Sequence, residues 1–430
     1  MRFFQWLGIL RALMAAERKK ALEQKDLVCL KLVRAVTPFC RALDRVESNV
    51  HGNTVLGLTD TLLVLLAGFF NPMVRSLRPV EHLSQMPWAA EHLGGKRVCR
   101  STLSDALARF DPEQLKPVID GLMKQIPHLA RRDGDLEQVC RKIIAADGST
   151  FALAADVAWA MIHQRGGKDP RSHGTCRLNL QLCVDSFTPV DLSVSGSDEG
   201  GEAAAFARRI LPDVTYLFDR NFVHFGLINR VLEQGSDLVL RLRKDTGFAP
   251  VESRLLGAKD VAAKVQSDRV GTLPGSPGGR TGPPPAQLMR EVIVDGDDGK
   301  PLRLITNLLD LPAHVIAALY RRRWQVELFF RWLKVWAGFE HLISRSKKGV
   351  TFQFYVAVIG CLLMHVRTGR KVNKYAIFLF GQVAAGLTTL EHILPMLEKI
   401  EHEKELERRR LAKKKTRKQL CGAAAKMPVQ

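Results

Sequence analysis

One short stretch of the chain combines a carboxylate with three residue types that bind phosphate. The stretch reads YRRRWQVELFFRWLK, and the residues concerned are Tyr320, Arg323, Glu327 and Lys334. On an ideal α-helix these four side chains lie within about 60° of one another, so they share one face. The other side of the helix is apolar, as expected for a face that a core buries. A carboxylate framed by a phenol, a guanidinium and an ammonium suits a metal-binding acid beside a phosphate backbone.

Two further carboxylates end apolar segments that predict strands. Asp147 ends the segment that begins at Lys142 and precedes Gly-Ser, which we interpret as a turn, and Asp219 ends the segment that begins at Val214. Carboxylates at the ends of neighbouring strands converge at one sheet edge, where Glu327 would close the site. Three converging carboxylates repel one another unless hard divalent cations neutralise them. We therefore predict two Mg²⁺ or Mn²⁺ ions that activate a hydroxyl and stabilise the leaving oxygen of a phosphodiester.

Each carboxylate also has an ordinary structural explanation. Asp147 before Gly-Ser is typical of a turn, and Asp219 at the start of the next segment is typical of a helix N-cap. Glu327 is spaced to pair with Arg323 or Arg331 one helical turn away. The order of the three carboxylates, and the elements that carry them, favour one shared metal site over three separate explanations.

The elements that must position these residues alternate between strands and helices. Apolar or alternating segments predict strands at 142–147, 177–184, 190–194, 214–219 and 238–242. Helical spacing predicts a helix at 203–211, after the third strand, and another at 222–234, after the fourth. Three strands, a helix, a strand, a helix and a strand is the order of a ribonuclease H-like α/β core.

The composition indicates a polyanionic partner. The 430 residues carry a formal net charge of +20, which favours nucleic acid. The eight cysteines include no CxxC pair, so the sequence predicts no structural zinc site. The apolar runs at 62–70 and 354–366 are shorter than the roughly 20 residues that span a bilayer. We therefore predict that both runs form buried helices and that the chain does not associate with a membrane.

The fold class we predict is α/β, with a ribonuclease H-like core that a β-containing insertion interrupts and that helical regions flank. The predicted domains are a helical N-terminal DNA-binding region at 1–138, the first part of the core at 139–243, an inserted subdomain at 244–310, the core helix with Glu327 at 311–345, and C-terminal helices with a basic tail at 346–430. The insertion contains a Gly/Pro-rich loop at 271–285 and a hairpin formed by Glu291–Val294 and Leu302–Thr306.

These residues together resemble the DDE transposases of bacterial insertion sequences. The chain is similar to the branch marked by Tyr-x2-Arg-x3-Glu-x6-Lys, which is matched at every spacing by Tyr320, Arg323, Glu327 and Lys334. Asp147 within IIAADGST resembles the first catalytic block of that family, and Asp219 within YLFDRNF resembles the second. The resemblance covers about 140–345 and extends to the flanking regions only in general character.

The resemblance implies cut-and-paste transposition at the terminal inverted repeats of an insertion sequence. Asp147, Asp219 and Glu327 would hold two Mg²⁺ (or Mn²⁺) ions. Water would attack at the end of the element, the freed 3′-hydroxyl would form a hairpin with the opposite strand, and the reopened end would join target DNA. The residues that would contact phosphates near the cleaved terminus are Tyr320, Arg323 and Lys334. The resemblance also implies double-stranded DNA as the partner, a homodimer on DNA, and a cytoplasmic, nucleoid-associated location in bacteria.

Two other functions stay open on the residues alone. One is a metal-dependent DNA nuclease that cuts without strand transfer, and the other is an inactive DNA-binding remnant of a transposase. The three intact carboxylates argue against the remnant. Related enzymes that form hairpins stack a flipped base on a tryptophan of the inserted region, whereas residues 244–300 contain none. Phe248 is a weaker candidate platform for that base.

Overall fold

The computed structural model describes residues 43, 56–70, 76–85, 98–126, 134–154, 156–163, 173–197, 201–275, 282–296, 299–336, 342–369, 372–384 and 388–424. The first 42 residues of the predicted N-terminal region therefore lie outside the described part. The chain divides into two compact units, a larger one, Val36–Val372, and a smaller one that includes Asn373–Gln430.

The described part of the smaller unit consists of two helices. These are α14 (Lys374–Ala384) and α15 (Leu390–Ala424), and the predicted basic tail lies within α15. The Lys404 ammonium lies 3.7 Å from the centroid of the Tyr375 ring, which is a cation–π contact between the two helices.

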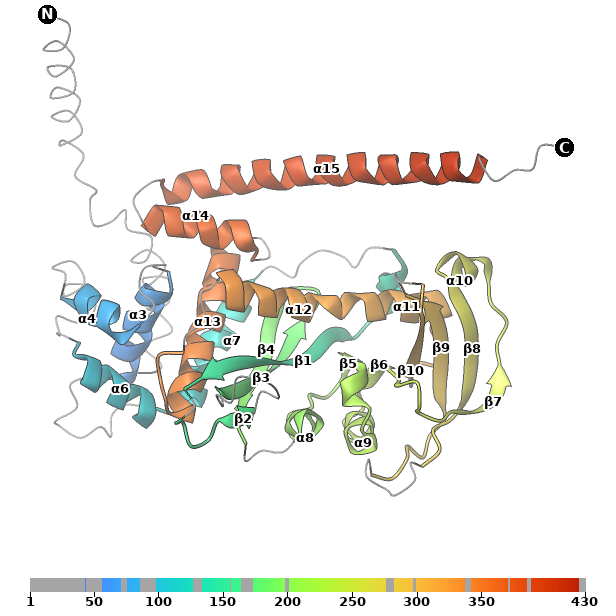
Figure 1. Ribbon diagram of the computed structural model, residues 1–430, viewed down its shortest axis with the longest axis horizontal. Coiled ribbons are helices and arrows are strands. Elements are labelled where there is room, and N and C mark those ends of the chain that lie inside the picture. The colour runs from blue at the N-terminus through green and yellow to red at the C-terminus, as the bar shows by residue number, and fades with distance from the viewer. Residues whose placement is uncertain are drawn as a thin grey trace, which may run out of the picture. The chain divides into compact units, whose positions relative to one another are not determined.

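The larger unit is built around a ten-stranded mixed sheet, which confirms the predicted mixed α/β class (Figure 1). The strands are β1 (Lys142–Leu153), β2 (Met161–His163), β3 (His173–Cys183), β4 (Thr188–Ser195), β5 (Val214–Phe218), β6 (Asp237–Arg241), β7 (Ala249–Ser253), β8 (Val265–Thr272), β9 (Met289–Asp295) and β10 (Pro301–Thr306). Their order is β2-β3-β1-β5-β6-β10-β9-β8-β7, and β4 pairs with β3.

The five strands and two helices predicted for the centre of the chain are all present. β1, β5 and β6 are parallel neighbours, and β3 pairs antiparallel with both β1 and β4. The connecting helices α8 (Glu202–Ala207) and α9 (Phe225–Glu233) cover one face of the sheet (Figure 1). Beneath them Tyr216 and Phe218 stack with their ring centroids 5.2 Å apart. Apolar or alternating runs made these elements predictable, and the core buries β5 at all five positions and β6 at its three central ones.

β1 differs from the prediction because it does not end at Asp147. Asp147 pairs with Leu180 of β3, and the pairing continues to Leu153, so the predicted turn after Asp147 is wrong. The parallel pairing of β1 with β5 stops earlier, at Ala145. The antiparallel partner β3 supplies the hydrogen bonds that keep the rest of β1 extended. Asp147 therefore lies just past the point where β5 ends, although its own strand continues.

The region between β6 and the signature helix extends the same sheet. The predicted hairpin is confirmed as β9 and β10, with Pro301 opposite Asp295. The prediction missed β7, β8 and the short helix α10 (Ala258–Ala262). All five residues of β7 are exposed, so β7 has no apolar alternation that a sequence pattern could reveal.

The signature segment is not the single regular helix that its spacing predicts. It consists of α11 (Ala313–Arg322), α12 (Trp324–Arg331) and a π-helical turn at Trp332–Trp336. At the junction the Arg323 amide donates to the Tyr320 carbonyl at 3.0 Å, and the Val326 amide donates to the Arg323 carbonyl at 3.1 Å. These three-residue spacings tighten the helix, whereas the π turn widens it. Lys334 is therefore displaced from the position that an ideal helix would give it.

Helices fill the rest of the described part of the larger unit. They are α3 (Leu58–Phe69), α4 (Leu77–Ser84), α6 (Arg100–Arg109), α7 (Lys116–Met123) and α13 (Lys347–Thr368). Within the described residues, α13 alone is long and apolar enough to cross a membrane, but 89% of its most apolar window is buried inside the protein. A Cβ atom added at Gly360 of α13 would overlap the Phe69 ring, so this close approach requires glycine. The prediction of buried helices at both apolar runs is confirmed.

Candidate active site

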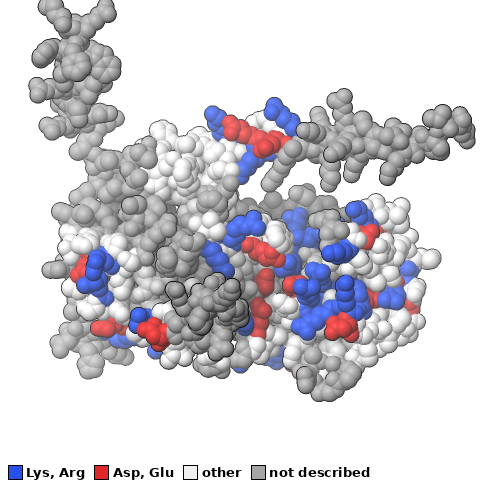
Figure 2. Space-filling view, viewed as in Figure 1, with Lys and Arg blue, Asp and Glu red and all other residues white. Residues whose placement is uncertain are grey.

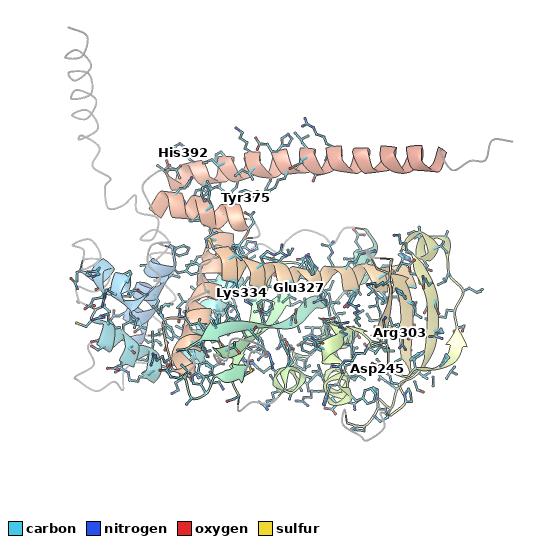
Figure 3. The ribbon with its side chains drawn as sticks, in the orientation of Figure 1. Asp245, Arg303, Glu327, Lys334, Tyr375 and His392 are labelled. Atoms are coloured by element: carbon cyan, nitrogen blue, oxygen red, sulfur yellow. The ribbon has the colours of Figure 1, made fainter. Side chains whose placement is uncertain are left out.

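Arg323 joins two of the predicted carboxylates. Its Nη2 donates to Glu327 Oε1 at 2.5 Å, and its Nη1 lies 3.5 Å from Asp147 Oδ2. The guanidinium also lies 5.9 Å from the centroid of the Tyr320 ring. The Arg323 side chain is only 11% exposed, so this contact is largely shielded from water. The signature segment crosses the face of the sheet opposite α8 and α9, and this crossing brings Glu327 above β1 (Figures 1 and 3).

Asp219 belongs to the same site. It follows the last residue of β5 directly, and its Oδ1 accepts a hydrogen bond from the Arg220 amide at 2.6 Å. Asp219 thus caps the 3-10 turn Arg220–Phe222, which agrees with the helix N-cap that the sequence offered as its structural explanation. Its charge also acts on Asp147 and on Tyr320, where it favours the protonated form of each. The capping role and the place in the acidic site are therefore compatible.

The environment of Asp147 disfavours its charged form. Burial raises the pKa of Asp147 to about 7, and the charges of Glu202 and Asp219 act in the same direction. The Arg323 guanidinium and a 2.9 Å hydrogen bond from the Gly148 amide oppose this rise. A buried carboxylate among other carboxylates is the setting in which a bound cation stabilises the charged form most strongly.

Glu202 is a fourth carboxylate that the sequence interpretation missed. It is the first residue of α8, and burial raises the pKa of Glu202, as does Asp219, while Arg177 and the Gly148 amide lower it. A Cβ atom added at Gly148 would overlap Glu202 Oε1, so the absence of a side chain at Gly148 lets Glu202 approach this closely. The available signal was its position: a carboxylate that starts the helix between the third and fourth core strands lies at the same sheet edge as Asp219.

Tyr320 and Lys334 differ in how closely they approach the carboxylates. Tyr320 is buried, and burial raises the pKa of its hydroxyl while the Arg323 guanidinium opposes the rise. Lys334 lies on the π turn with its ammonium 4.8 Å from the centroid of the Phe151 ring of β1, and burial lowers the pKa of Lys334. Within the described residues Lys334 forms no ion pair. The structure thus brings five of the six predicted residues together and leaves Lys334 beside the far half of β1.

The donor atoms of the site fit a hard divalent cation. Asp147, Asp219 and Glu327 offer carboxylate oxygens, which Mg²⁺ and Mn²⁺ prefer. Among the residues that the structure describes, however, no three His, Cys, Asp or Glu side chains are close enough to hold an ion together. The guanidinium of Arg323 lies between Asp147 and Glu327 and compensates their charge. An ion shared by these two carboxylates therefore requires Arg323 to move aside.

Comparison with known proteins finds transposases. The chain is 26% identical over 267 residues to a putative transposase, y4zB, of Sinorhizobium fredii, covering 61% of this chain and 70% of that one. It is 28% identical over 220 residues to a probable transposase for insertion sequence element IS5377 of Geobacillus stearothermophilus, covering 51% of this chain and 54% of that one. A piggyBac transposase synaptic complex with hairpin DNA covers 86% of this chain and 78% of its own at 10% identity, but the TM-score of 0.36 is too low to support an argument.

The family comparison covers the acidic site itself. Residues 138–364 match the family described as "Transposase DDE domain". The matched range is more than half of the 430-residue chain, and it includes Asp147, Asp219 and Glu327. The chain therefore belongs to the DDE transposase family.

Proposed function

We propose that this transposase catalyses cut-and-paste transposition of an insertion sequence, by metal-dependent hydrolysis and strand transfer at the terminal inverted repeats. The observation that supports the proposal best is the Arg323 guanidinium, which contacts Asp147 of β1 and Glu327 of α12, while the charge of Asp219, directly after β5, acts on Asp147. In this proposal the strands β4-β3-β1-β5-β6 are a ribonuclease H-like core, and β7, β8 and β9 belong to the inserted subdomain.

The carboxylates and the cationic residues would have separate roles. Asp147, Asp219 and Glu327 would hold two Mg²⁺ or Mn²⁺ ions, which supply an activated hydroxyl and a stabilised leaving oxygen. Arg323 neutralises Asp147 and Glu327 in the arrangement described, and its planar fork matches a phosphate once it leaves them. Its Nε is buried and has no hydrogen-bond partner among the described residues, so the guanidinium is not fully satisfied where it lies. Tyr320 would donate its hydroxyl to a phosphate, and Lys334 would act as a point charge farther along the strand.

The proposed partners are the double-stranded inverted repeats and the target DNA, held by a homodimer. Strand transfer joins two ends to one target, so two active sites must be held together. The N-terminal helical region would contribute to DNA binding. The two arginines that bound α6 are already engaged, because Arg100 pairs with Glu81 at 3.0 Å and Arg109 donates to the Leu56 carbonyl at 3.0 Å.

Glu327→Gln tests the proposed chemistry. We expect a loss of at least about 10³-fold in cleavage of inverted-repeat DNA with Mg²⁺, because a metal centre contributes several kcal/mol to phosphodiester cleavage. DNA affinity measured without divalent ions should stay within about threefold of wild type, since Gln adds no repulsion to phosphate. The matched control is Glu233→Gln, an exposed residue that pairs with Arg230 on α9.

The products distinguish the proposed reaction from its alternatives. Cleavage followed by joining to target DNA is expected, whereas cleavage without joining would indicate a nuclease. Equal cleavage by wild type and Glu327→Gln would contradict the mechanism, and tight binding without cleavage by wild type would indicate an inactive remnant.

Glu202→Gln tests whether the fourth carboxylate supports the metal site. We expect cleavage to fall by about 10–100-fold and the Mn²⁺ concentration for half-maximal binding, measured by calorimetry, to rise by a similar factor. The reason is that Glu202 adds negative charge next to Asp147 and shares the Gly148 amide with it. A purely structural role would instead lower the melting temperature and leave the Mn²⁺ affinity of the folded protein unchanged.

A further inference from the structure

A pocket lined by cationic side chains lies at the ends of β6 and β10, outside the acidic site. Its volume is about 420 Å³, and five of its eight lining residues are cationic while none is acidic. The cationic residues are Arg220, Arg241, Arg243, Lys244 and Arg303. Figure 2 shows Lys and Arg side chains gathered over this part of the sheet. Neither the signature residues nor the three carboxylates line it.

Arg303 holds the wall of the pocket in place. From β10 its Nη1 donates to the Thr246 carbonyl at 2.8 Å, and it also reaches the Arg243 and Lys244 carbonyls at 3.3 Å and 3.2 Å. Its Nε donates to Glu291 Oε1 at 2.7 Å, and the Glu291 side chain is completely buried. The Arg303 guanidinium thus holds the backbone of the loop that follows β6. Asp245, which belongs to this loop, and Arg303 are both labelled in Figure 3.

The other four cations have no carboxylate partner within the described part of the chain. Arg220, Arg241, Arg243 and Lys244 form no ion pair with any carboxylate that the structure describes. Arg243 uses its Nε to bind the Arg220 carbonyl at 3.2 Å, which leaves the rest of its guanidinium to face the pocket. Four like charges in one concavity repel one another and raise the local concentration of anions. The pocket is therefore built to receive negative charge.

Two residues that line the pocket, Arg220 and Arg241, connect it to the acidic site. Arg220 is the residue directly after Asp219, and its amide caps that carboxylate. Arg241 lies close enough to Tyr320 to oppose, together with Arg323, the rise that burial causes in the pKa of the Tyr320 hydroxyl. A phosphodiester strand that places one phosphate at the carboxylates would thus bring a neighbouring phosphate to the pocket.

We propose that this pocket is a second phosphate-binding subsite, which holds the backbone of a DNA strand next to the phosphate that is cut. The proposal rests on the proposed function, because it takes the acidic site as the place of cleavage. A DNA strand fits better than a single free phosphate, since the cations come from the ends of β5, β6 and β10 and four of them lack a described carboxylate partner, which is more positive charge than one phosphate neutralises. The subsite contains none of the three cationic or phenolic residues of the signature, so it would clamp the strand independently of Tyr320, Arg323 and Lys334.

The double variant Arg243→Gln/Lys244→Gln tests the subsite. The readout is the affinity of the full chain for inverted-repeat duplex DNA in EDTA, measured by fluorescence anisotropy over a series of salt concentrations. Each phosphate contact contributes about 0.9 to the slope of log K against log salt, so we expect the slope to become shallower by about 1–2. The matched control is Lys259→Gln/Lys264→Gln, which removes the same charge from exposed residues at and beside α10.

Equal slopes for the pocket variant and the control variant would overturn the proposal. Displacement of DNA from wild type by millimolar inorganic phosphate, with no change of slope in the pocket variant, would also overturn it, because the pocket would then bind a small anion only. The measurement uses no divalent ion and no cleavage. A negative binding result therefore counts against the phosphate subsite alone. A negative Glu327→Gln result counts against the proposed cleavage mechanism and does not change the binding measurement.

Discussion

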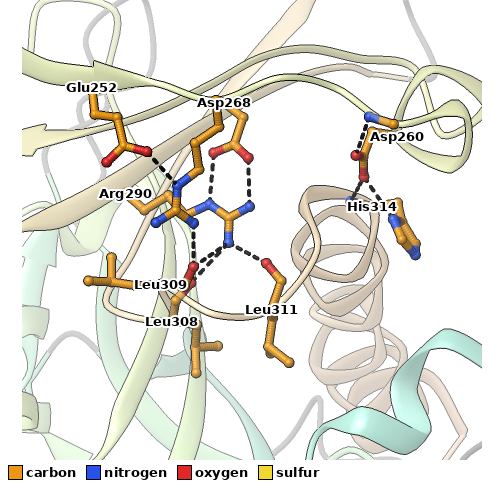
Figure 4. Close-up of polar contacts among 10 residues, drawn as sticks. Glu252, Asp260, Asp268, Arg290, Leu308, Leu309, Leu311 and His314 are labelled. Atoms are coloured by element: carbon orange, nitrogen blue, oxygen red, sulfur yellow. Dashed lines mark hydrogen bonds and ion pairs between the residues drawn. The ribbon is translucent and has the colours of Figure 1, made fainter.

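Replacing Arg290 by methionine is expected to lower the free energy of unfolding by about 3–5 kcal/mol, since it leaves a buried charge without its partner. Arg290 and Asp268 are 2% and 5% exposed, and two parallel hydrogen bonds of 2.7 Å join them (Figure 4). Arg290 Nη1 also donates to the carbonyls of Leu308, Leu309 and Leu311. The variant would bury the Asp268 carboxylate and three carbonyls without these donors.

A double-mutant cycle separates the ion pair from the packing. Arg290→Met/Asp268→Leu should lose less than the sum of the two single variants, because it leaves no unpaired charge in the interior. Arg230→Met is the control, since its partner Glu233 is exposed and surface pairs contribute little. Denaturant unfolding provides the measurement. The expectation would be contradicted if the free energy of unfolding of Arg290→Met lay within about 1 kcal/mol of wild type, which is the contribution of a surface pair.

This cluster links β8 and β9 to α11, the first helix of the signature segment. Leu308–Leu311, which Arg290 binds, leads directly into α11, and α11 carries Tyr320. Asp260 of α10 binds the start of the same helix, where its Oδ1 accepts from the His314 amide at 2.8 Å and lies 2.7 Å from His314 Nδ1 (Figure 4). β9 and α10 therefore help to position Tyr320 and the residues that follow it.

The parts of the fold that the sequence predicts well are the apolar or alternating runs that the core buries. β5 is buried at all five positions and β6 at its three central ones, and the β9–β10 hairpin is marked by a turn rich in Gly and Asp. β7 and β8 could not be found this way. β7 is exposed throughout, and β8 buries Asp268, whose burial is favourable only because Arg290 from the next strand pairs with it. The sequence of β8 alone does not reveal that Asp268 has a partner on another strand.

In the candidate site, too, some features follow from the sequence and others depend on tertiary packing. The sequence points to Asp147, Asp219 and Glu327 because their residue types and order match a family signature. The contacts of Arg323 with two carboxylates, and the approach of Glu202, depend on how β1, α8 and α12 pack. The displacement of Lys334 follows from a change of helix type, which spacing on an ideal helix cannot reveal. The tertiary packing therefore decides which charges meet.

Replacing Asp147 by asparagine is expected to abolish cleavage without destabilising the protein. Asn keeps the shape and retains an oxygen that can accept from the Gly148 amide, but it lacks the charge that holds a cation. We expect cleavage to fall by at least about 10³-fold, as for loss of a metal ligand worth several kcal/mol. Because burial disfavours the charged form of Asp147, the melting temperature in EDTA should be equal to or higher than that of wild type.

The combination of these two readouts identifies the role of Asp147. A carboxylate that only supports the fold would lose activity and melting temperature together when it is replaced. A carboxylate kept in a destabilising environment for its chemistry would lose activity alone. The control is Asp156→Asn, an exposed residue that pairs with Arg345 at 2.8 Å and should leave both readouts unchanged. Retained cleavage by Asp147→Asn, or a parallel fall in melting temperature, would contradict the proposed role of Asp147 in cutting the phosphodiester.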